Sequence, residues 1–444
     1  NPQQAKDGGC HNQYKRKIYD RQKRCQTMWI YGENRIASKW YLWYDEYELD
    51  GKKGLLASQS SYHRMEEIMN TKKLGFGLMR LPLTDPADTT KIDYERVCKM
   101  VDRYLEAGFH YFDTAVPYHG GGYSEIAFRE CVAKRFPRDA YTITDKLSFF
   151  IVKKAEELED FFAGQLERCG VEYFDYYLFH AMNKERLELA ERIGAFDFVE
   201  RKMAEGKILH VGFSFHDTAD VLEEFLTRHP EMEYVQLQIN YADWEDPEVQ
   251  SQKCYEVCQK FRKPVIVMEP VKGGLLANVP EEAEDLLKKA DPNRSVASWA
   301  VRYAASLENV VMVLSGMSNE EQLEDNVSYM QDFNALSEKE RETICKAAAV
   351  IKEKERIACT ACRYCVDDCP NQIPIPDYFK LLNRISKFGK GQIPTARTAY
   401  AQQTENGGSN KASDCIKCGL CEEHCPQHLP VRKYLEDAAK ILEA

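Results

Sequence analysis

The chain has 444 residues, of which 44% are hydrophobic, and its formal charge is -11 at a sequence pI near 5.6. An acidic chain without a basic stripe is not typical of nucleic-acid binders or of proteins that bind anionic membranes. The length exceeds what one hydrophobic core usually organises, and no apolar run of membrane length or signal-peptide core is apparent, so we expect a cytoplasmic protein with at least two domains.

Residues 1–64 differ in composition from the rest of the chain. They carry 12 Lys and Arg against 7 Asp and Glu, hold three of the five tryptophans, and show little apolar periodicity. We expect an N-terminal extension rather than a domain, with a natural start at Met65 or Met69. The alternative is a basic, aromatic arm that contacts a partner.

Residues 73–331 alternate short apolar runs with longer amphipathic ones, which predicts repeated beta-alpha units around a parallel sheet. Eight such strands close a TIM barrel, expected here over residues 65–336. An open doubly wound sheet is less favoured, because no G-x-G-x-x-G follows the first strand. The expected strands are Leu74–Met79, Tyr111–Thr114, Tyr141–Thr144, Tyr176–His180, Ile208–Ser214, Tyr234–Asn240, Val265–Glu269 and Val310–Ser315.

Four polar residues lie at or just after strand ends, where TIM barrels carry their chemistry. Asp113 ends the second strand, Tyr118 follows in its loop, Lys146 closely follows the third strand, and His180 ends the fourth. Together they suit carbonyl chemistry: a tyrosine acid, a lysine that lowers its pKa, an aspartate that orients the lysine, and a histidine that binds the substrate oxygen. Taken singly, each could instead be a helix cap, a packed aromatic, a surface lysine or a core histidine.

A second domain is expected over residues 337–444. Ser337-Glu-Lys-Glu340 is a capping box that predicts a helix running toward Cys359 and a stiff junction between the domains. A further helix is expected over Asp377–Ile385, followed by a Gly, Ser and Asn-rich loop at residues 405–413.

This second domain contains C-x2-C-x2-C-x3-C-P twice, which is the bacterial ferredoxin spacing. Three thiolates of one run hold a 4Fe-4S cluster and the fourth crosses to the other cluster. A zinc site is the alternative, but paired C-x2-C knuckles would not produce this doubled run. The expected ligand sets are Cys359, Cys362, Cys365 with Cys425, and Cys415, Cys418, Cys421 with Cys369.

The other eight cysteines show no framework spacing, and we expect them to be buried free thiols in a reducing compartment. Cys254 and Cys258 lie one helical turn apart and could bind a metal, although packing is the favoured interpretation because no third ligand type lies nearby.

Several motifs make the region from about 70 to 331 resemble the aldo/keto reductase family, in the branch that carries a C-terminal 4Fe-4S domain. The long helical insert between the cysteine runs resembles the alpha-helical ferredoxins found fused into larger oxidoreductases. The motifs are Phe112-Asp-Thr-Ala115 with Tyr118 and Ser124-Glu125, Thr144-Asp-Lys146, Asp175-Tyr-Tyr-Leu-Phe-His180, Val211-Gly-Phe-Ser214, and Ser315-Gly316 followed by Glu321-Gln322 and Asn326.

The resemblance implies Tyr118 as the acid, Lys146 and Asp113 as its tuners, and His180 as the orienting group. It also implies a nicotinamide cofactor, NADH or NADPH, whose carboxamide lies near Ser214 and Gln236. The expected nucleotide-binding residues are Ser214, Gln236, Gly316, Ser318, Gln322 and Asn326.

The chain departs from the family pattern at two places. Met268-Glu269-Pro270-Val271 stands where many members have a tyrosine that stacks on the nicotinamide. Gly316 and Gln322 stand where members that prefer NADPH place a cation for the 2'-phosphate, so that preference does not carry over. Lys272 and Arg302 are the candidate substitutes for that cation.

The sequence therefore predicts an oxidoreductase that interconverts a carbonyl and an alcohol on a small molecule and exchanges electrons through two 4Fe-4S clusters, with an electron-transfer protein as a partner. Hydride carries an electron pair whereas clusters pass single electrons, so a flavin in the barrel mouth, a substrate that accepts single electrons, or structural clusters are open alternatives. The rival interpretation is an electron-transfer or redox-sensing module whose barrel binds nucleotide without turnover.

Overall fold

The computed structural model describes residues 72–444 except 247, 248, 355, 389 and 407. The extension expected over residues 1–64 lies outside the described residues. The described residues belong to one compact unit, which contains both the barrel and the cysteine runs.

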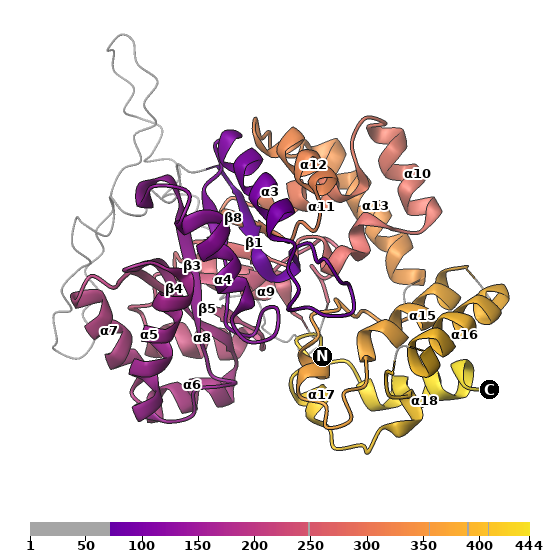
Figure 1. Ribbon diagram of the computed structural model, residues 1–444. Helices are drawn as coiled ribbons and strands as arrows, with labels where there is room; N and C mark the ends of the chain where they lie inside the picture. The colour runs from indigo at the N-terminus through magenta and orange to yellow at the C-terminus, as the bar shows by residue number, and fades with distance from the viewer. Residues whose placement is uncertain (1–71, 247–248, 355, 389, 407) are drawn as a thin grey trace, which may run out of the picture. The chain divides into compact units, whose positions relative to one another are not determined.

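Eight parallel strands close into a barrel in chain order, with β1 pairing to β8, and this is the TIM barrel that the sequence predicts (Figure 1). Most of these strands are buried on both faces, as is usual where helices surround a parallel sheet. The strands are β1 (Leu74–Gly77), β2 (Tyr111–Asp113), β3 (Thr142–Ser148), β4 (Phe174–Met182), β5 (Ile208–Phe215), β6 (Tyr234–Gln238), β7 (Val265–Met268) and β8 (Val310–Ser315).

Large side chains fill the interior of the barrel, so it is a packed core rather than a pore. Tyr111, Tyr176 and Tyr234 are buried there, with Leu178, Ile266 and Leu314. The Thr144 hydroxyl donates to the Tyr111 hydroxyl oxygen at 2.6 Å, which gives one of the buried phenols a partner.

Helices lie on the outside of the strands and bury their apolar faces against them (Figure 1). In α3, for example, Val97, Met100, Val101 and Tyr104 are buried. The barrel helices are α3 (Tyr94–Glu106), α4 (Tyr123–Phe128), α5 (Leu158–Cys169), α6 (Lys184–Arg192), α7 (Ala195–Ala204), α8 (Ala219–Arg228), α9 (Ser251–Lys260), α10 (Glu281–Ala290), α11 (Val296–Ala305) and α12 (Glu320–Met330).

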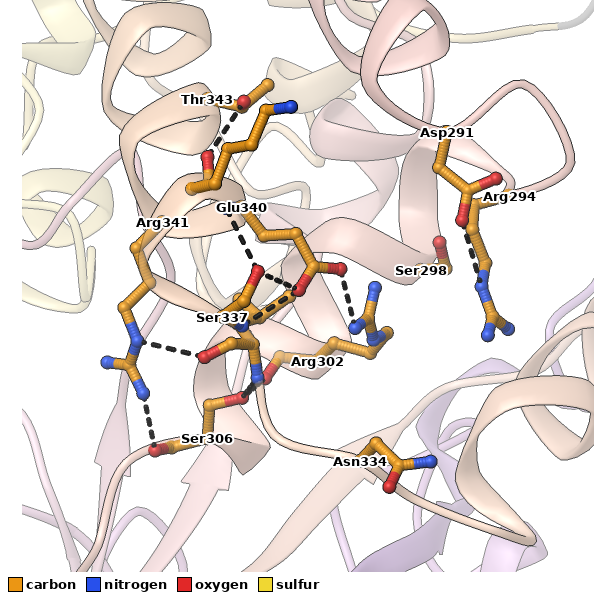
Figure 2. A network of polar contacts seen from close by, with 12 residues as sticks. Asp291, Arg294, Ser298, Arg302, Ser306, Asn334, Ser337, Glu340, Arg341 and Thr343 are labelled. Carbon is orange, nitrogen blue, oxygen red and sulfur yellow. Dashed lines mark hydrogen bonds and ion pairs between the residues drawn. The ribbon is translucent and has the colours of Figure 1, made fainter.

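Helix α13 (Glu338–Lys354) leads from the barrel toward the cysteine runs and begins at the predicted capping box. The Ser337 backbone N–H donates to Glu340 at 2.8 Å, and the Glu340 N–H lies 3.4 Å from the Ser337 hydroxyl oxygen. Figure 2 shows that the same carboxylate meets Arg302 of α11 at 2.8 Å, while Arg341 donates to the Ser306 carbonyl. The start of α13 is thus anchored to a barrel helix.

The C-terminal part is helical and has an apolar core of its own, built from residues such as Tyr378, Phe379, Val431 and Leu435. The predicted helix over Asp377–Ile385 lies within the longer α15. The helices are α14 (Tyr364–Asp367), α15 (Ile375–Phe388), α16 (Ile393–Ala401), α17 (Leu420–Glu423) and α18 (Val431–Leu442). Nowhere in the part of the chain that the structure describes is a helix both long and apolar enough to cross a membrane.

Candidate active site and cysteine cavities

A cavity of about 340 Å³ lies at the carboxyl ends of the barrel strands, and we name it the barrel cavity. Its lining includes all four residues expected for carbonyl chemistry and all six expected for the nucleotide. The ten residues come from strands and loops spread from β2 to α12, so the fold brings together what the sequence scatters. They are Asp113, Tyr118, Lys146, His180, Ser214, Gln236, Gly316, Ser318, Gln322 and Asn326.

Lys146 and Asp113 form a buried ion pair. The Lys146 Nζ donates to Asp113 Oδ1 at 2.6 Å and to the Thr114 carbonyl at 2.7 Å. Burial raises the pKa of Asp113, and the charge of Lys146 opposes that shift. Lys146 lies inside β3 and not after it as predicted, because β3 continues through the buried polar residues Asp145 and Ser148.

The backbone of Lys146 is held on both sides. Its N–H donates to Asp145 Oδ1 at 2.7 Å, and its carbonyl accepts from Gln165 Nε2 at 3.0 Å. Asp145 and Gln165 are completely buried. The lysine is therefore fixed by its own strand and by α5, which keeps its ammonium directed toward Asp113.

Tyr118 lies in the loop after β2 and is 9% exposed. The Lys146 ammonium lies over its ring, 4.9 Å from the centroid. Burial raises the pKa of Tyr118 well above its ordinary value, and the carboxylates of Asp113, Asp145 and Glu269 raise it further. The expected net lowering by Lys146 does not appear, and the phenol keeps its proton at neutral pH, as an acid must before it reacts.

His180 is neutral. Burial and the charges of Lys146, His216 and Arg186 lower its pKa well below the ordinary value. Its Nε2 lies 3.1 Å from the hydroxyl oxygen of Tyr364, and its Nδ1 is buried without a hydrogen-bond partner. His180 does not end its strand as predicted, because β4 continues to Met182.

The residues expected for the nucleotide already have specific contacts. Ser214 Oγ accepts from the Ala181 N–H at 2.7 Å, Gln322 Oε1 accepts from the Ser318 N–H at 2.7 Å, and Asn326 Nδ2 donates to Ser315 Oγ at 2.8 Å. Gln236 Oε1, by contrast, is buried without a partner. An amide with an unused acceptor suits a ligand that brings a donor.

Neither candidate substitute for the phosphate-binding cation faces the barrel cavity. Lys272 is 2% exposed and forms an ion pair with Asp243, while Arg302 pairs with Glu340 at the start of α13. Besides Lys146, which pairs with Asp113, the cavity is lined by the cation Arg80, in the short helical turn after β1. Its Cδ lies 3.3 Å from where a Cβ on Gly316 would be. Sequence reasoning missed Arg80, although its place after the first strand was a usable signal.

The eight cysteines of the two runs surround two separate small cavities. The first cysteine group lines one of them, and the second cysteine group lines the other. The first group is Cys359, Cys362, Cys365 and Cys425, and the second group is Cys369, Cys415, Cys418 and Cys421.

The spacing of the thiols bears on which metal they fit. A tetrahedral zinc site with Zn–S distances of about 2.3 Å would bring its sulfur atoms within about 4 Å of one another. Among the described residues, no three of the eight thiols have sulfur atoms within 4.8 Å of one another. Four thiols spread around a cavity fit a cluster better than a single ion.

Cys362 lines both the cavity of the first cysteine group and the barrel cavity. Thr360, Tyr364 and Pro426 of the C-terminal domain also line the barrel cavity. No local sequence signal placed these residues at the barrel cavity, because the spacing of a cysteine run does not show which surface of another domain it contacts. A metal centre in the first group would lie next to whatever the barrel binds.

Contacts between side chains, and between a side chain and the backbone, join the two domains at this point, and we single out three of them. Arg80 Nη2 donates to the Thr360 carbonyl at 3.0 Å, and Gln427 Nε2 donates to Gln238 Oε1 at 2.6 Å. The third is the contact between His180 and Tyr364. We call this set the domain contact.

Comparison with known proteins gives the family. The sequence family described as "Aldo/keto reductase family" matches residues 73–349, more than half of the chain, and a "4Fe-4S dicluster domain" matches residues 358–429. The chain therefore belongs to the aldo/keto reductase family and carries a C-terminal 4Fe-4S domain. It has the barrel fold and the oxidoreductase character of that family.

Solved structures similar to this chain are aldo/keto reductases. The holo form of AKR11C1 from Bacillus halodurans is 25% identical, with a TM-score of 0.50, and the match covers 62% of this chain and 91% of that one. An aldo-keto reductase from Klebsiella pneumoniae in complex with NADPH is 19% identical, with a TM-score of 0.50, and covers 62% of this chain and 90% of its own. No match was found among curated proteins.

Proposed function

We propose that the protein is an iron-sulfur oxidoreductase that interconverts a carbonyl and an alcohol on a small molecule. Residues 65–336 would form the catalytic barrel, residues 337–444 the domain with two 4Fe-4S clusters, and residues 1–64 an extension. The observation that carries this proposal is the lining of the barrel cavity, where the four chemical residues, the six nucleotide residues and Cys362 meet.

The cofactors supply chemistry that the chain's own residues lack. NAD(P)H, when bound, supplies a hydride, and 4Fe-4S clusters, when bound, pass electrons singly. The structure of NADPH bound to the Klebsiella pneumoniae relative supports a nicotinamide nucleotide as the occupant of the barrel cavity. The grouping of the cysteines supports one cluster in each group.

The residues of the barrel have distinct tasks in carbonyl reduction. Tyr118 gives its phenolic proton to the carbonyl oxygen as negative charge develops there. The ion pair of Lys146 and Asp113 holds a positive charge against the Tyr118 ring, and it stabilises the phenolate that remains. His180, being neutral, helps to orient the carbonyl oxygen of the substrate through hydrogen bonding rather than through charge.

Substitution of the acid tests the proposal. In anaerobically purified, cluster-loaded protein, Tyr118→Phe should lower aldehyde reduction with NADH or NADPH by at least about 100-fold, because it removes only the donated proton. Iron content and nucleotide binding should stay at wild-type levels. Tyr123→Phe is the matched control, since Tyr123 lies five residues on and is 40% exposed.

The pKa shifts of Tyr118 and His180 predict how the wild-type rate depends on pH. Since the pKa of Tyr118 is raised above 10 and that of His180 is lowered below 6.5, neither group should change its charge between about pH 7 and 9. The rate of the chemical step should therefore be flat across that range. Wild-type activity in the Tyr118→Phe variant would contradict the role of Tyr118 as the acid. A wild-type protein that binds NADH or NADPH but reduces no carbonyl compound would favour the rival, a barrel that binds nucleotide without turnover.

A further inference from the structure

Tyr364 belongs to the cysteine run, between Cys362 and Cys365, yet it lines the barrel cavity. It is the first residue of α14, and the residue before it, Arg363, has a left-handed backbone with φ of 70°. Its hydroxyl oxygen lies 3.1 Å from His180 Nε2, a contact between residues 184 positions apart. The C-terminal domain thus inserts a phenol among the residues proposed for carbonyl chemistry.

The Tyr364 ring is held in place by aromatic neighbours. The Phe150 ring lies 5.5 Å from it and meets His180 edge-on at 5.6 Å. Phe150 in turn contacts His424 at 5.9 Å, and the Arg186 guanidinium lies 4.3 Å from its centroid. A phenol packed in this way keeps its hydroxyl in one place, as a group that orients a substrate must.

The hydrogen-bond count shows where the Tyr364 proton can go. Neutral His180 carries one N–H. Nδ1 has no partner among the described residues in either tautomer, but a buried N–H without an acceptor is rarer in proteins than a buried acceptor without a donor, so we place the proton on Nε2. With the proton on Nε2, His180 donates to the Tyr364 oxygen, and the tyrosine's own O–H remains free to donate to a ligand in the barrel cavity.

We propose that Tyr364 is a substrate-contacting residue of the barrel site, which donates a hydrogen bond to the substrate oxygen while His180 holds it in position. The proposal rests on the proposed carbonyl chemistry. The substrate oxygen then lies between two phenols, Tyr118 from the barrel and Tyr364 from the cluster domain, and His180 is a positioning residue that acts through Tyr364. The barrel site is complete only when the cluster domain is docked.

Tyr364→Phe tests this directly, because it keeps the ring and its packing and removes only the hydroxyl. We expect kcat/KM for aldehyde reduction to fall about 100-fold, the usual cost of losing one oxyanion donor. Iron content and the cluster spectrum should not change. Tyr434→Phe is the matched control, since Tyr434 lies in the same domain and packs on Phe379 at 5.5 Å, outside the barrel cavity.

A double-mutant cycle separates a serial arrangement from two independent contacts. If His180 acts through Tyr364, then His180→Gln and Tyr364→Phe should each cause a similar loss, and the double variant should lose no more than either. Additive losses would show that His180 contacts the substrate itself and would overturn the serial role.

The outcomes distinguish this inference from the function on which it rests. Wild-type kcat/KM in Tyr364→Phe, together with an inactive Tyr118→Phe variant, would overturn the Tyr364 contact and leave the proposed function standing. An equal loss in Tyr434→Phe would show a general structural effect and would also overturn the contact. A wild-type protein that reduces no aldehyde with either nucleotide would remove the proposed function and the contact together.

Discussion

The two cysteine groups differ in what they face. In the first group Cys362 lines the barrel cavity, and burial raises the pKa values of Cys359, Cys362 and Cys365. In the second group Cys418 is exposed, and its neighbour Ile416 is 61% exposed. Under the proposed function, this difference orders the electron path: a partner protein meets the second cluster, and the first cluster meets the barrel.

The largest expected effect comes from removing one ligand of each group. Cys362→Ser should abolish cluster reduction by NADH or NADPH, because the damaged centre lies beside the barrel cavity. Cys418→Ser should preserve reduction of the first cluster and lose electron entry from an external one-electron donor. Cluster bleaching and the paramagnetic signal of reduced 4Fe-4S, followed anaerobically, measure both.

Iron analysis accompanies that comparison. Wild type should hold about eight irons per chain, and both variants should hold fewer. Cys345→Ser is the control, since Cys345 is an exposed free thiol on α13 outside both groups. If Cys418→Ser blocked reduction by nucleotide as completely as Cys362→Ser, the two groups would not be ordered as described.

A smaller effect is expected where the barrel backbone approaches the first group. A Cβ on Gly273 would lie 1.9 Å from the Thr360 carbonyl oxygen, whereas a Cβ on the adjacent Gly274 would meet nothing within 4 Å. Both residues have positive φ, at 62° and 94°, so both alanine variants carry backbone strain of about 1–2 kcal/mol. Gly273→Ala should cost about 1–3 kcal/mol more, because it pushes Thr360 away.

The apparent melting temperature, measured anaerobically, should therefore be lower for Gly273→Ala than for Gly274→Ala. Iron lost from the Gly273→Ala variant should come from the first group. Equal melting temperatures would show that the backbone of Thr360 yields without cost, and that the domain contact is looser than the structure indicates.

The smallest expected effects come from single polar contacts near each group. Gln427 is 4% exposed and donates to Gln238, so Gln427→Ala should cost about 1 kcal/mol. Lys417, beside the second group, pairs with Glu436 while its side chain is 64% exposed, so Lys417→Ala should cost less than about 0.5 kcal/mol. The melting temperatures of the Gln427→Ala and Lys417→Ala variants compare the two costs. A larger decrease in melting temperature for Lys417→Ala would contradict the expectation drawn from the difference in burial.

Much of the barrel could be predicted from the sequence because apolar runs mark its strands. Val310–Ser315 was predicted with the bounds that β8 has. The errors lie where polar residues are buried: the prediction ended the third strand at Thr144, but β3 continues through Asp145, Lys146 and Ser148. Their polarity suggested a loop, whereas inside the barrel Lys146 Nζ donates to Asp113, the Lys146 carbonyl accepts from Gln165, and Asp145 accepts from the Lys146 N–H.

The site was less predictable than the fold wherever it depends on contacts between distant segments. The ten residues expected in the barrel cavity lie at strand ends or in family motifs, so the sequence could predict them. Tyr364 could not, because its contact with His180 depends on how a second domain packs. Hydrophobic periodicity predicts helices and strands, but it contains no information about which side chain of one domain contacts the other domain.

Arg80 has a consequence for how the chain can change over evolutionary time. Its guanidinium binds the carbonyl oxygens of Thr360 and Ala361, at 3.0 and 3.5 Å, and not their side chains. Every amino acid presents the same carbonyl, so mutations at positions 360 and 361 leave this attachment intact. Arg80 itself has no such freedom, since only its planar group offers several donors in fixed directions. Sequence drift should therefore be unequal across the two domains, with the arginine retained while its partners vary.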